Sequence, residues 1–190
     1  MYAWFMSLKQ PDGSFIVAHD SEVDVRGTYC LLVAATLLDI LTPELVAGTA
    51  AFVASCQTYE GGFASASQPF FAPGAVDPLP APRPPLGEAH GGYTFCALGA
   101  WALLRPFARA LPPAERPRLR TRALRRWLAQ LQGSPAELGG FRGRTNKLVD
   151  GCYSWWVGGA FDLLGVLDLD AKAGAPAVGT HPIMADDVEY

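Results

Sequence analysis

Apolar residues recur along the chain at the three- and four-residue spacing of amphipathic helices, in segments separated by glycine-containing turns. The clearest of these segments cover residues 45–56 and 119–131. The first eight residues are also apolar and helix-like, and no capping residue precedes them, so we expect the chain to begin partway through a helix. Strand signals are almost absent. The pattern therefore predicts an all-α fold.

A short motif occurs three times and indicates a repeated structural unit. In each copy a glutamine precedes a glycine turn and a phenylalanine. The copies are LKQPDGSF at residues 8–15, CQTYEGGF at 56–63 and LQGSPAELGGF at 131–141. Each copy follows one apolar segment and precedes a loop and a second apolar segment. We therefore expect helical hairpins that stack on one another and bury their shared faces.

The second segments of the repeats align on a tyrosine, in RGTY (26–29), HGGY (90–93) and DGCY (150–153). Three residues before the tyrosine, the same slot holds Arg26, His90 and Asp150. Small residues follow about two turns later, at 34–35, 99–100 and 159–160. If these equivalent helices form the inner ring of a toroid, the slot residues and Cys152 converge on one central cavity.

The second repeat contains an insertion. The distance from the phenylalanine to the slot residue is 11 residues in the first repeat, 27 in the second and 9 in the third. The excess matches the proline-rich stretch 69–86, which we predict to be an extended surface insertion, because proline lacks an amide donor and disfavours a helix before it. The predicted organisation is a toroid core over residues 1–165 and an irregular Ala/Gly/Pro-rich tail over residues 166–190.

The composition is typical of a globular unit. Hydrophobic residues make up 50% of the chain, and the net charge of -3 predicts neither nucleic-acid binding nor attraction to an anionic membrane. No apolar run approaches the roughly 18 residues of a transmembrane helix. The four cysteines have no CxxC spacing, and no secretory signal precedes them, so we expect reduced thiols and a cytoplasmic location.

Asp150 and Cys152 form the first candidate for chemistry. At a helix start, Asp150 can cap the helix while Cys152 lies in the first turn, where the amide dipoles favour the thiolate that binds metal. A carboxylate and a thiolate together suit zinc. The alternative is an ordinary N-terminal cap beside a small buried cysteine.

Basic and phenolic groups surround this pair in the sequence. Arg144 and Lys147 precede Asp150, and with Tyr153 and His90 they offer donors suited to a polyphosphate, or else they form a solvated basic turn. Arg26 has the alternative of pairing with Asp24 or Glu22. Aromatic residues would line the cavity or belong to the core, namely Tyr29, Tyr93, Phe95, Trp155 and Trp156. Together these groups predict a long apolar substrate with an anionic head group, such as a prenyl diphosphate.

The motifs SLKQPDGSF, EVDVRGTYC, CQTYEGGF, EAHGGYTFC and GRTNKLVDGCYSWW resemble those of protein farnesyltransferase β subunits, in the protein prenyltransferase β-subunit family. The resemblance covers most of residues 1–165, and NKLVDGC is closer to the farnesyl enzymes than to the geranylgeranyl ones. It implies an α/α toroid, incomplete at both ends in this chain, that pairs with a farnesyltransferase α subunit. The implied reaction transfers farnesyl from farnesyl diphosphate to the cysteine of C-terminal CaaX proteins.

The resemblance also implies roles for individual residues. Asp150 and Cys152 would be zinc ligands. The diphosphate would be held by His90, Arg144, Lys147 and Tyr153. Arg26 would face the carboxyl end of the peptide, and the positions that match the isoprenoid pocket are Tyr29, Cys96 and Trp156.

The third zinc ligand of the family is a histidine in a His-Thr-Cys-Tyr motif, which belongs to the next repeat. By the repeat length it is expected roughly 46 to 60 residues after Tyr153, outside this chain of 190 residues. His181 is the remaining histidine downstream, within the Ala/Gly/Pro-rich tail. A carboxylate for the magnesium ion that the family also uses has no assignable counterpart. Two alternatives stay open: a non-catalytic fragment that binds a prenyl group or the α subunit, and a geranylgeranyltransferase β subunit.

Overall fold

The computed structural model describes residues 1–67 and 84–173. Within these residues it contains seven α-helices, one 3-10 helix and a two-stranded ladder. The helices are α1 (Tyr2–Leu8), α2 (Val25–Leu37), α3 (Pro43–Val46), α4 (Thr49–Ser55), α5 (Gly91–Ala110), α6 (Thr121–Gln130), η1 (Pro135–Glu137) and α7 (Tyr153–Ala173). The strands are β1 (Ala66–Ser67) and β2 (Pro85–Leu86), which pair antiparallel. The predicted helical class is confirmed.

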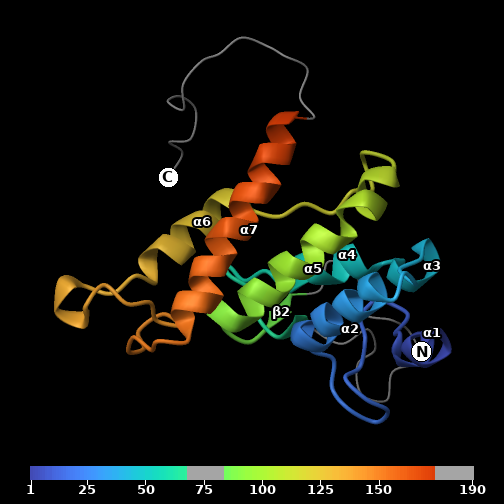
Figure 1. Cartoon of the computed structure of the whole chain (residues 1–190), viewed down its shortest axis with the longest axis horizontal. Coiled ribbons are helices and arrows are strands. Elements are labelled where there is room, and N and C mark those ends of the chain that lie inside the picture. Colours follow the sequence, from blue (N-terminus) through green and yellow to red (C-terminus); the bar gives the residue numbers. More distant parts are fainter. Residues whose placement is uncertain (68–83, 174–190) are drawn as a thin grey trace.

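Three helices form one layer of the molecule. Helices α2, α5 and α7 lie side by side, and α5 contacts both of its neighbours (Figure 1). Helix α4 packs on α5, and α6 packs on α7, so a second layer covers the first. The starting ends of α2, α5 and α7 lie at the same edge, toward the bottom of the view in Figure 1. This arrangement gathers the residues that precede the three helices.

Glycines of α5 and α7 allow aromatic rings of the neighbouring helix to pack closely against them. A β-carbon added at Gly99 of α5 would lie 2.5 Å from a ring carbon of Tyr29 on α2. One added at Gly159 of α7 would lie 2.8 Å from a ring carbon of Phe95 on α5. Real β-carbons do not approach atoms so closely, so glycine allows each ring to lie against the next helix. The same contact therefore recurs from one repeat to the next.

The glutamine of the second motif stabilises its glycine turn. The side-chain amide of Gln57 donates to the Gly61 carbonyl at 2.8 Å, and its oxygen accepts the N–H of Arg120 at 2.9 Å. Gly61 has a φ of 117° and lies against the Ala123 carbonyl, so a side chain there would clash. A β-bridge closes each of the three motifs, joining Lys9 to Phe15, Gln57 to Phe63 and Gln132 to Phe141. The predicted repeat is therefore present in the fold.

The predicted helix over 45–56 is divided in two. Gly48, between α3 and α4, has a φ of 77° and backs onto Gly13 of the first turn. This left-handed conformation ends one helix and starts the next. The apolar spacing could not reveal the break, because Leu45 and Phe52 are buried on either side of it.

Two predicted boundaries differ from the structure. Pro85 and Leu86, assigned to the insertion, form β2, so the last part of that stretch is a strand. The proline is tolerated because the ladder has only two strands, both of them edges. Helix α7 continues to Ala173, past the predicted boundary at residue 165. The rest of the predicted insertion (69–83) and of the predicted tail (174–190) lies outside the described residues.

Buried side chains form two clusters. The larger one joins α2, α4, α5, α6 and α7, with Trp127 and Phe63 fully buried within it. The smaller one lies between α1, α2 and α3 and contains Phe5, Phe15 and Leu45. None of the helices described here is both long enough and apolar enough to cross a membrane.

Candidate functional site

The loops that precede α5 and α7 end in the same hydrogen bond. The N–H of His90 donates to the Phe63 carbonyl at 3.0 Å, and the N–H of Asp150 donates to the Phe141 carbonyl at 3.0 Å. Each side chain then accepts the N–H two residues further on, at 3.0 Å for His90 Nδ1 and 2.9 Å for Asp150 Oδ1. His90 and Asp150 therefore hold equivalent positions, as the repeat predicts.

The third member of this set is Asp24, and the assignment of Arg26 to the slot is wrong. Asp24 Oδ1 accepts the N–H of Arg26 at 2.7 Å, which is the same contact over two residues. A β-bridge ends one residue before Asp24 and one residue before Asp150. The tyrosine alignment is displaced because Tyr29 follows its cap by five residues, whereas the other two tyrosines follow theirs by three.

Arg26 nevertheless lies at the edge shared by the helix starts. Its guanidinium forms an ion pair with Asp24 at 2.6 Å, and the exposed fractions of the two side chains are 57% and 6%. This confirms the alternative in which Arg26 pairs with Asp24. The hydrogen bond with the carboxylate raises the pKa of Arg26. The guanidinium carbon also lies 5.1 Å from the centre of the Tyr93 ring, one turn from His90.

His90 and Tyr153 are in direct contact. His90 Nε2 and Tyr153 Oη are 3.1 Å apart, although the residues are 63 positions apart in the sequence. Because His90 Nδ1 accepts a backbone N–H, we infer that Nε2 carries the proton and donates it to Tyr153 Oη. The phenol hydrogen of Tyr153 is then available to donate to a ligand.

Burial and charge keep both groups in the protonation states that this arrangement needs. Burial lowers the pKa of His90, and the nearby cations Arg144 and Arg26 lower it further, against the opposing effect of Glu88. The imidazole is therefore neutral at neutral pH. Burial also raises the pKa of Tyr153, so its phenol remains protonated.

Arg144 and Lys147 belong to one turn before α7. The N–H of Lys147 donates to the Arg144 carbonyl at 3.3 Å, and Asn146 between them has a φ of 60°, a conformation that asparagine tolerates well. The Arg144 guanidinium pairs with Glu88, which lies two residues before His90. The turn therefore brings Arg144 toward His90, while Lys147 is exposed beyond it.

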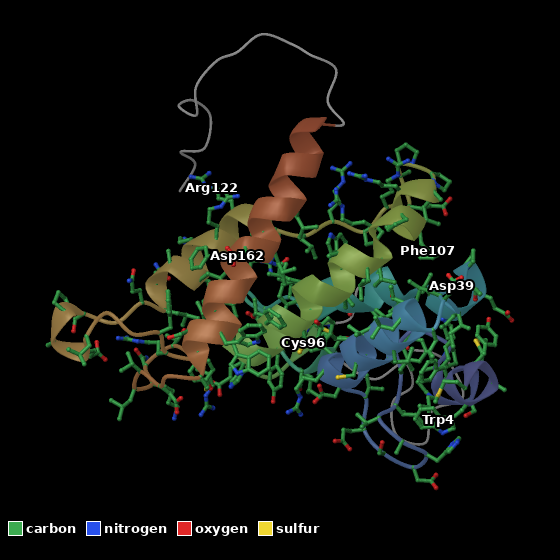
Figure 2. The ribbon with its side chains drawn as sticks, viewed as in Figure 1. Trp4, Asp39, Cys96, Phe107, Arg122 and Asp162 are labelled. Carbon is green, nitrogen blue, oxygen red and sulfur yellow. The ribbon has the colours of Figure 1, made fainter. Side chains whose placement is uncertain are left out.

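Aromatic rings continue from this polar cluster along α5. The ring centre of Phe95 lies 6.0 Å from Tyr29 and 5.4 Å from Trp156, both edge to face. Cys96 is buried beside them, and burial raises the pKa of its thiol to about 12, so it is a neutral, apolar group. Figure 2 shows Cys96 on α5, between α2 and α7. The predicted pocket residues Tyr29, Cys96 and Trp156 thus lie in one region.

Asp150 and Cys152 lie together at the exposed start of α7. The N–H of Cys152 lowers the pKa of Asp150, whereas the Asp150 carboxylate raises the pKa of the Cys152 thiol. The Asp150 carboxylate therefore opposes the thiolate that the helix start was expected to favour. The alternative of a buried cysteine is wrong, since Cys152 is exposed.

A carboxylate oxygen and a thiol on one helix start are donors that zinc accepts. Within residues 1–67 and 84–173, no third His, Cys, Asp or Glu completes a metal-binding group with them. His181 lies outside the described residues.

The sequence reasoning missed two acidic residues that contact the cluster. Glu88 pairs with Arg144, and Glu60 accepts a hydrogen bond from Thr145 at 2.8 Å. Both glutamates are present in the quoted motifs CQTYEGGF and EAHGGYTFC. Glu88 lies two residues before His90, and this position was the available signal for it, whereas sequence alone does not place Glu60 beside Thr145.

Comparison with known proteins agrees with the fold and the motifs. The family model described as "Prenyltransferase alpha-alpha toroid domain" matches residues 1–180. The chain is similar to the protein farnesyltransferase subunit beta of Pisum sativum, with 42% identity over 164 residues that cover 86% of this chain and 32% of the pea protein. It is 31% identical over 163 residues to the geranylgeranyl transferase type-1 subunit beta of Arabidopsis thaliana, covering 84% and 38% respectively.

A solved structure has the same fold. It is described as Candida albicans protein geranylgeranyltransferase-I complexed with GGPP, and it superposes with a TM-score of 0.59 at 22% identity. The match covers 91% of this chain and 49% of the other. The chain spans about a third of the length of the curated relatives it matches.

Proposed function

The chain belongs to the protein prenyltransferase β-subunit family and has its alpha-alpha toroid fold, and we propose that it is part of a farnesyltransferase β subunit. The proposed reaction transfers a farnesyl group from farnesyl diphosphate to the cysteine thiol of a C-terminal CaaX sequence. The higher identity to a farnesyl than to a geranylgeranyl relative supports the choice of lipid.

One observation carries the proposal: a chain of hydrogen-bond donors at the edge where α2, α5 and α7 begin. A backbone N–H donates to His90 Nδ1, and His90 Nε2 faces Tyr153 Oη at 3.1 Å. This order leaves the Tyr153 hydroxyl hydrogen for a diphosphate oxygen. Arg144 would add a fixed positive charge, because its guanidinium lies close enough to lower the pKa of His90. We assign His90, Tyr153, Arg144 and the exposed Lys147 to the diphosphate.

These groups would act on charge that develops as the carbon–oxygen bond breaks. The departing diphosphate gains negative charge on its bridging oxygen, and donors already aimed at that region stabilise it without reorganising. His90 would hold the Tyr153 phenol in place rather than transfer a proton itself. The neutral state of the imidazole supports this positioning role.

The apolar tail has a matching surface. Tyr29, Phe95 and Trp156 present edge-to-face rings beside the donors, and Cys96 adds an apolar thiol. Rings in this arrangement suit an isoprenoid chain, which carries methyl groups and double bonds but no polar atoms. We assign these residues to the isoprenoid and Arg26 to the peptide end of the cavity.

Asp150 and Cys152 would hold a zinc ion together with a ligand from elsewhere in the protein. When bound there, zinc would lower the pKa of the substrate thiol and so supply a thiolate at neutral pH. The two residues fit this role because both are exposed at one helix start. The partner would be a farnesyltransferase α subunit, and the four cysteine thiols agree with a cytoplasmic enzyme.

A transfer assay with competing lipids tests the proposal. The full-length protein that carries this chain, co-expressed with a farnesyltransferase α subunit, would receive equal amounts of farnesyl and geranylgeranyl diphosphate and a CaaX peptide. We expect farnesylated peptide as the main product. Equal or better use of the longer lipid would assign the geranylgeranyl reaction instead, and binding of either lipid without transfer would indicate a non-catalytic subunit.

A further inference from the structure

Glu60 lies between the two loops that carry the donors assigned to the diphosphate. One carboxylate oxygen accepts the hydroxyl hydrogen of Thr145 at 2.8 Å, and the other accepts the N–H of Ala89 at 3.4 Å. Thr145 is the residue after Arg144, and Ala89 is the residue before His90. A single side chain thus contacts both neighbours of the proposed donors, across 85 and 29 positions of sequence.

The turn that carries Glu60 is well fixed. Its neighbour Gly61 lies against α6, and the Gly61 carbonyl accepts the Gln57 side chain. The N–H of Gly61 donates to the Thr58 carbonyl at 3.1 Å, and the Thr58 N–H donates to the Gly62 carbonyl at 2.8 Å. Glu60 therefore extends from a rigid turn, whereas Thr145 belongs to an exposed loop.

Other contacts join the same two loops. The N–H of Gly91 donates to the Gly143 carbonyl at 2.8 Å, and Glu88 pairs with Arg144. The ion pair is largely exposed, so it contributes little to folding stability. These contacts fix the position of Arg144 relative to His90. Glu60 connects both loops to the rigid turn.

We propose that Glu60 is a positioning residue for diphosphate binding, which holds the Arg144 loop against the His90 loop. This inference rests on the proposed function. The Glu60 side chain does not contact the diphosphate, because a carboxylate would repel it. It acts through Thr145 and Ala89. Loss of the contact allows the Arg144 loop to move away from His90, and a displacement of about 1 Å at such a site can cost about a hundredfold.

Binding measurements on Glu60→Ala test the inference. The protein would be co-expressed with an α subunit and titrated with farnesyl diphosphate, inorganic pyrophosphate and uncharged farnesol. We expect the affinity for farnesyl diphosphate and pyrophosphate to fall about tenfold to a hundredfold, while the affinity for farnesol stays the same. A purely structural role would weaken all three ligands together or change only the melting temperature.

Two further variants complete the design. Thr145→Val removes only the hydroxyl of an exposed residue, so it should fold normally and weaken pyrophosphate binding in the same direction. The double variant should be no worse than Glu60→Ala alone, because both changes break one contact. Glu115→Ala, at an exposed glutamate of another loop, is the matched control and should bind as the wild type does.

The outcomes separate the inference from the proposed function. If the wild type binds farnesyl diphosphate and Glu60→Ala binds it equally well, Glu60 has no positioning role. Additive effects of the two substitutions would also overturn it. If the wild type itself binds neither farnesyl diphosphate nor pyrophosphate, the proposed function is wrong.

Discussion

Asp24 and Asp150 hold the same position in two repeats, yet their carboxylates have different surroundings. Each follows a β-bridge and caps a helix start by accepting the N–H two residues on. The side chain of Asp24 is 6% exposed and paired with Arg26. Asp150 is exposed and lies beside a thiol. The repeat thus determines where the carboxylate lies, and the residue two positions later determines what it can do.

His90 extends the comparison to the middle repeat. There the residue two positions on is Gly92, which has no side chain, and the cap is an imidazole that contacts Tyr153 of the next helix. One backbone position therefore supports an ion pair, a neutral hydrogen-bond relay and a carboxylate beside a thiol, the pair that we propose as metal donors. The difference shows how a repeat fold can place distinct chemistry around one edge without changing its backbone.

The largest effect should come from making Asp150 resemble Asp24. Cys152→Arg replaces the thiol with the cation found after Asp24, so the carboxylate gains an ion pair and the zinc donors are lost. We expect farnesyl transfer to fall about a thousandfold or more, because metal activation contributes several kcal/mol. Thermal melting should be unchanged or slightly raised. A variant that retains transfer would show that the chemistry does not depend on the residue after Asp150.

Tyr153→Phe tests the relay of the middle repeat. The substitution removes the hydroxyl that lies 3.1 Å from His90 and keeps the ring. We expect a loss of about a hundredfold in the rate of transfer, as for one donor of an oxyanion site. Single-turnover kinetics would measure it. Phe95→Leu, which alters the apolar surface, should weaken lipid binding more than it slows this step; the reverse pattern would contradict the assignment.

Asp24→Asn should affect stability instead of chemistry. Asparagine still caps the helix, but the charge that pairs with Arg26 is lost from a buried side chain. We expect a loss of about 1–2 kcal/mol in the free energy of unfolding, since the exposure of Arg26 limits the effect. Urea unfolding would measure it, with Asp150→Asn as the matched variant that should lose activity but little stability. Equal losses of stability in both would erase the contrast between the two positions.

The smallest effect should be a pH dependence at His90. Burial lowers the pKa of His90 in the folded protein below its usual value of 6.5. The folded state therefore binds the proton less readily than the unfolded state, so the contribution of His90 is complete above about pH 6.5 and is lost as the pH falls through the lower folded pKa. We expect a change of less than about 1 kcal/mol. Unfolding curves of His90→Asn, which keeps a capping side chain, should lack this part of the pH dependence; an unchanged curve would contradict it.

The sequence predicted the repeat well because its signals are local. Glutamine, glycine and phenylalanine recur at the turns, and each has a contact in the fold that requires it, such as Gln57 with the Gly61 carbonyl. Small residues at Gly99 and Gly159 likewise correspond to close ring contacts. The break at Gly48 could not be predicted in this way, because its conformation depends on Gly13 from another turn.

The sequence predicted which residues lie at the site more accurately than it predicted which of them are equivalent between the repeats. His90 and Asp150 are equivalent, but Asp24 takes the place that the tyrosine assigned to Arg26. The spacing from phenylalanine contained the answer, since both Asp24 and Asp150 come nine residues after one. Contacts such as Glu60 with Thr145 were beyond reach, because they join exposed side chains from separate repeats and leave no periodic signal.

Metal binding by Asp150 and Cys152 is the most direct test of the account. The full-length protein that carries this chain, co-expressed with an α subunit, would be stripped of metal and reconstituted with cobalt(II), whose absorption reveals a bound thiolate. We predict one metal ion per complex and a thiolate-to-cobalt band that is absent in Cys152→Ser and present in Cys30→Ser, a change at another exposed cysteine. A band that persists without Cys152, or wild-type protein that binds no metal yet transfers farnesyl, would contradict the account.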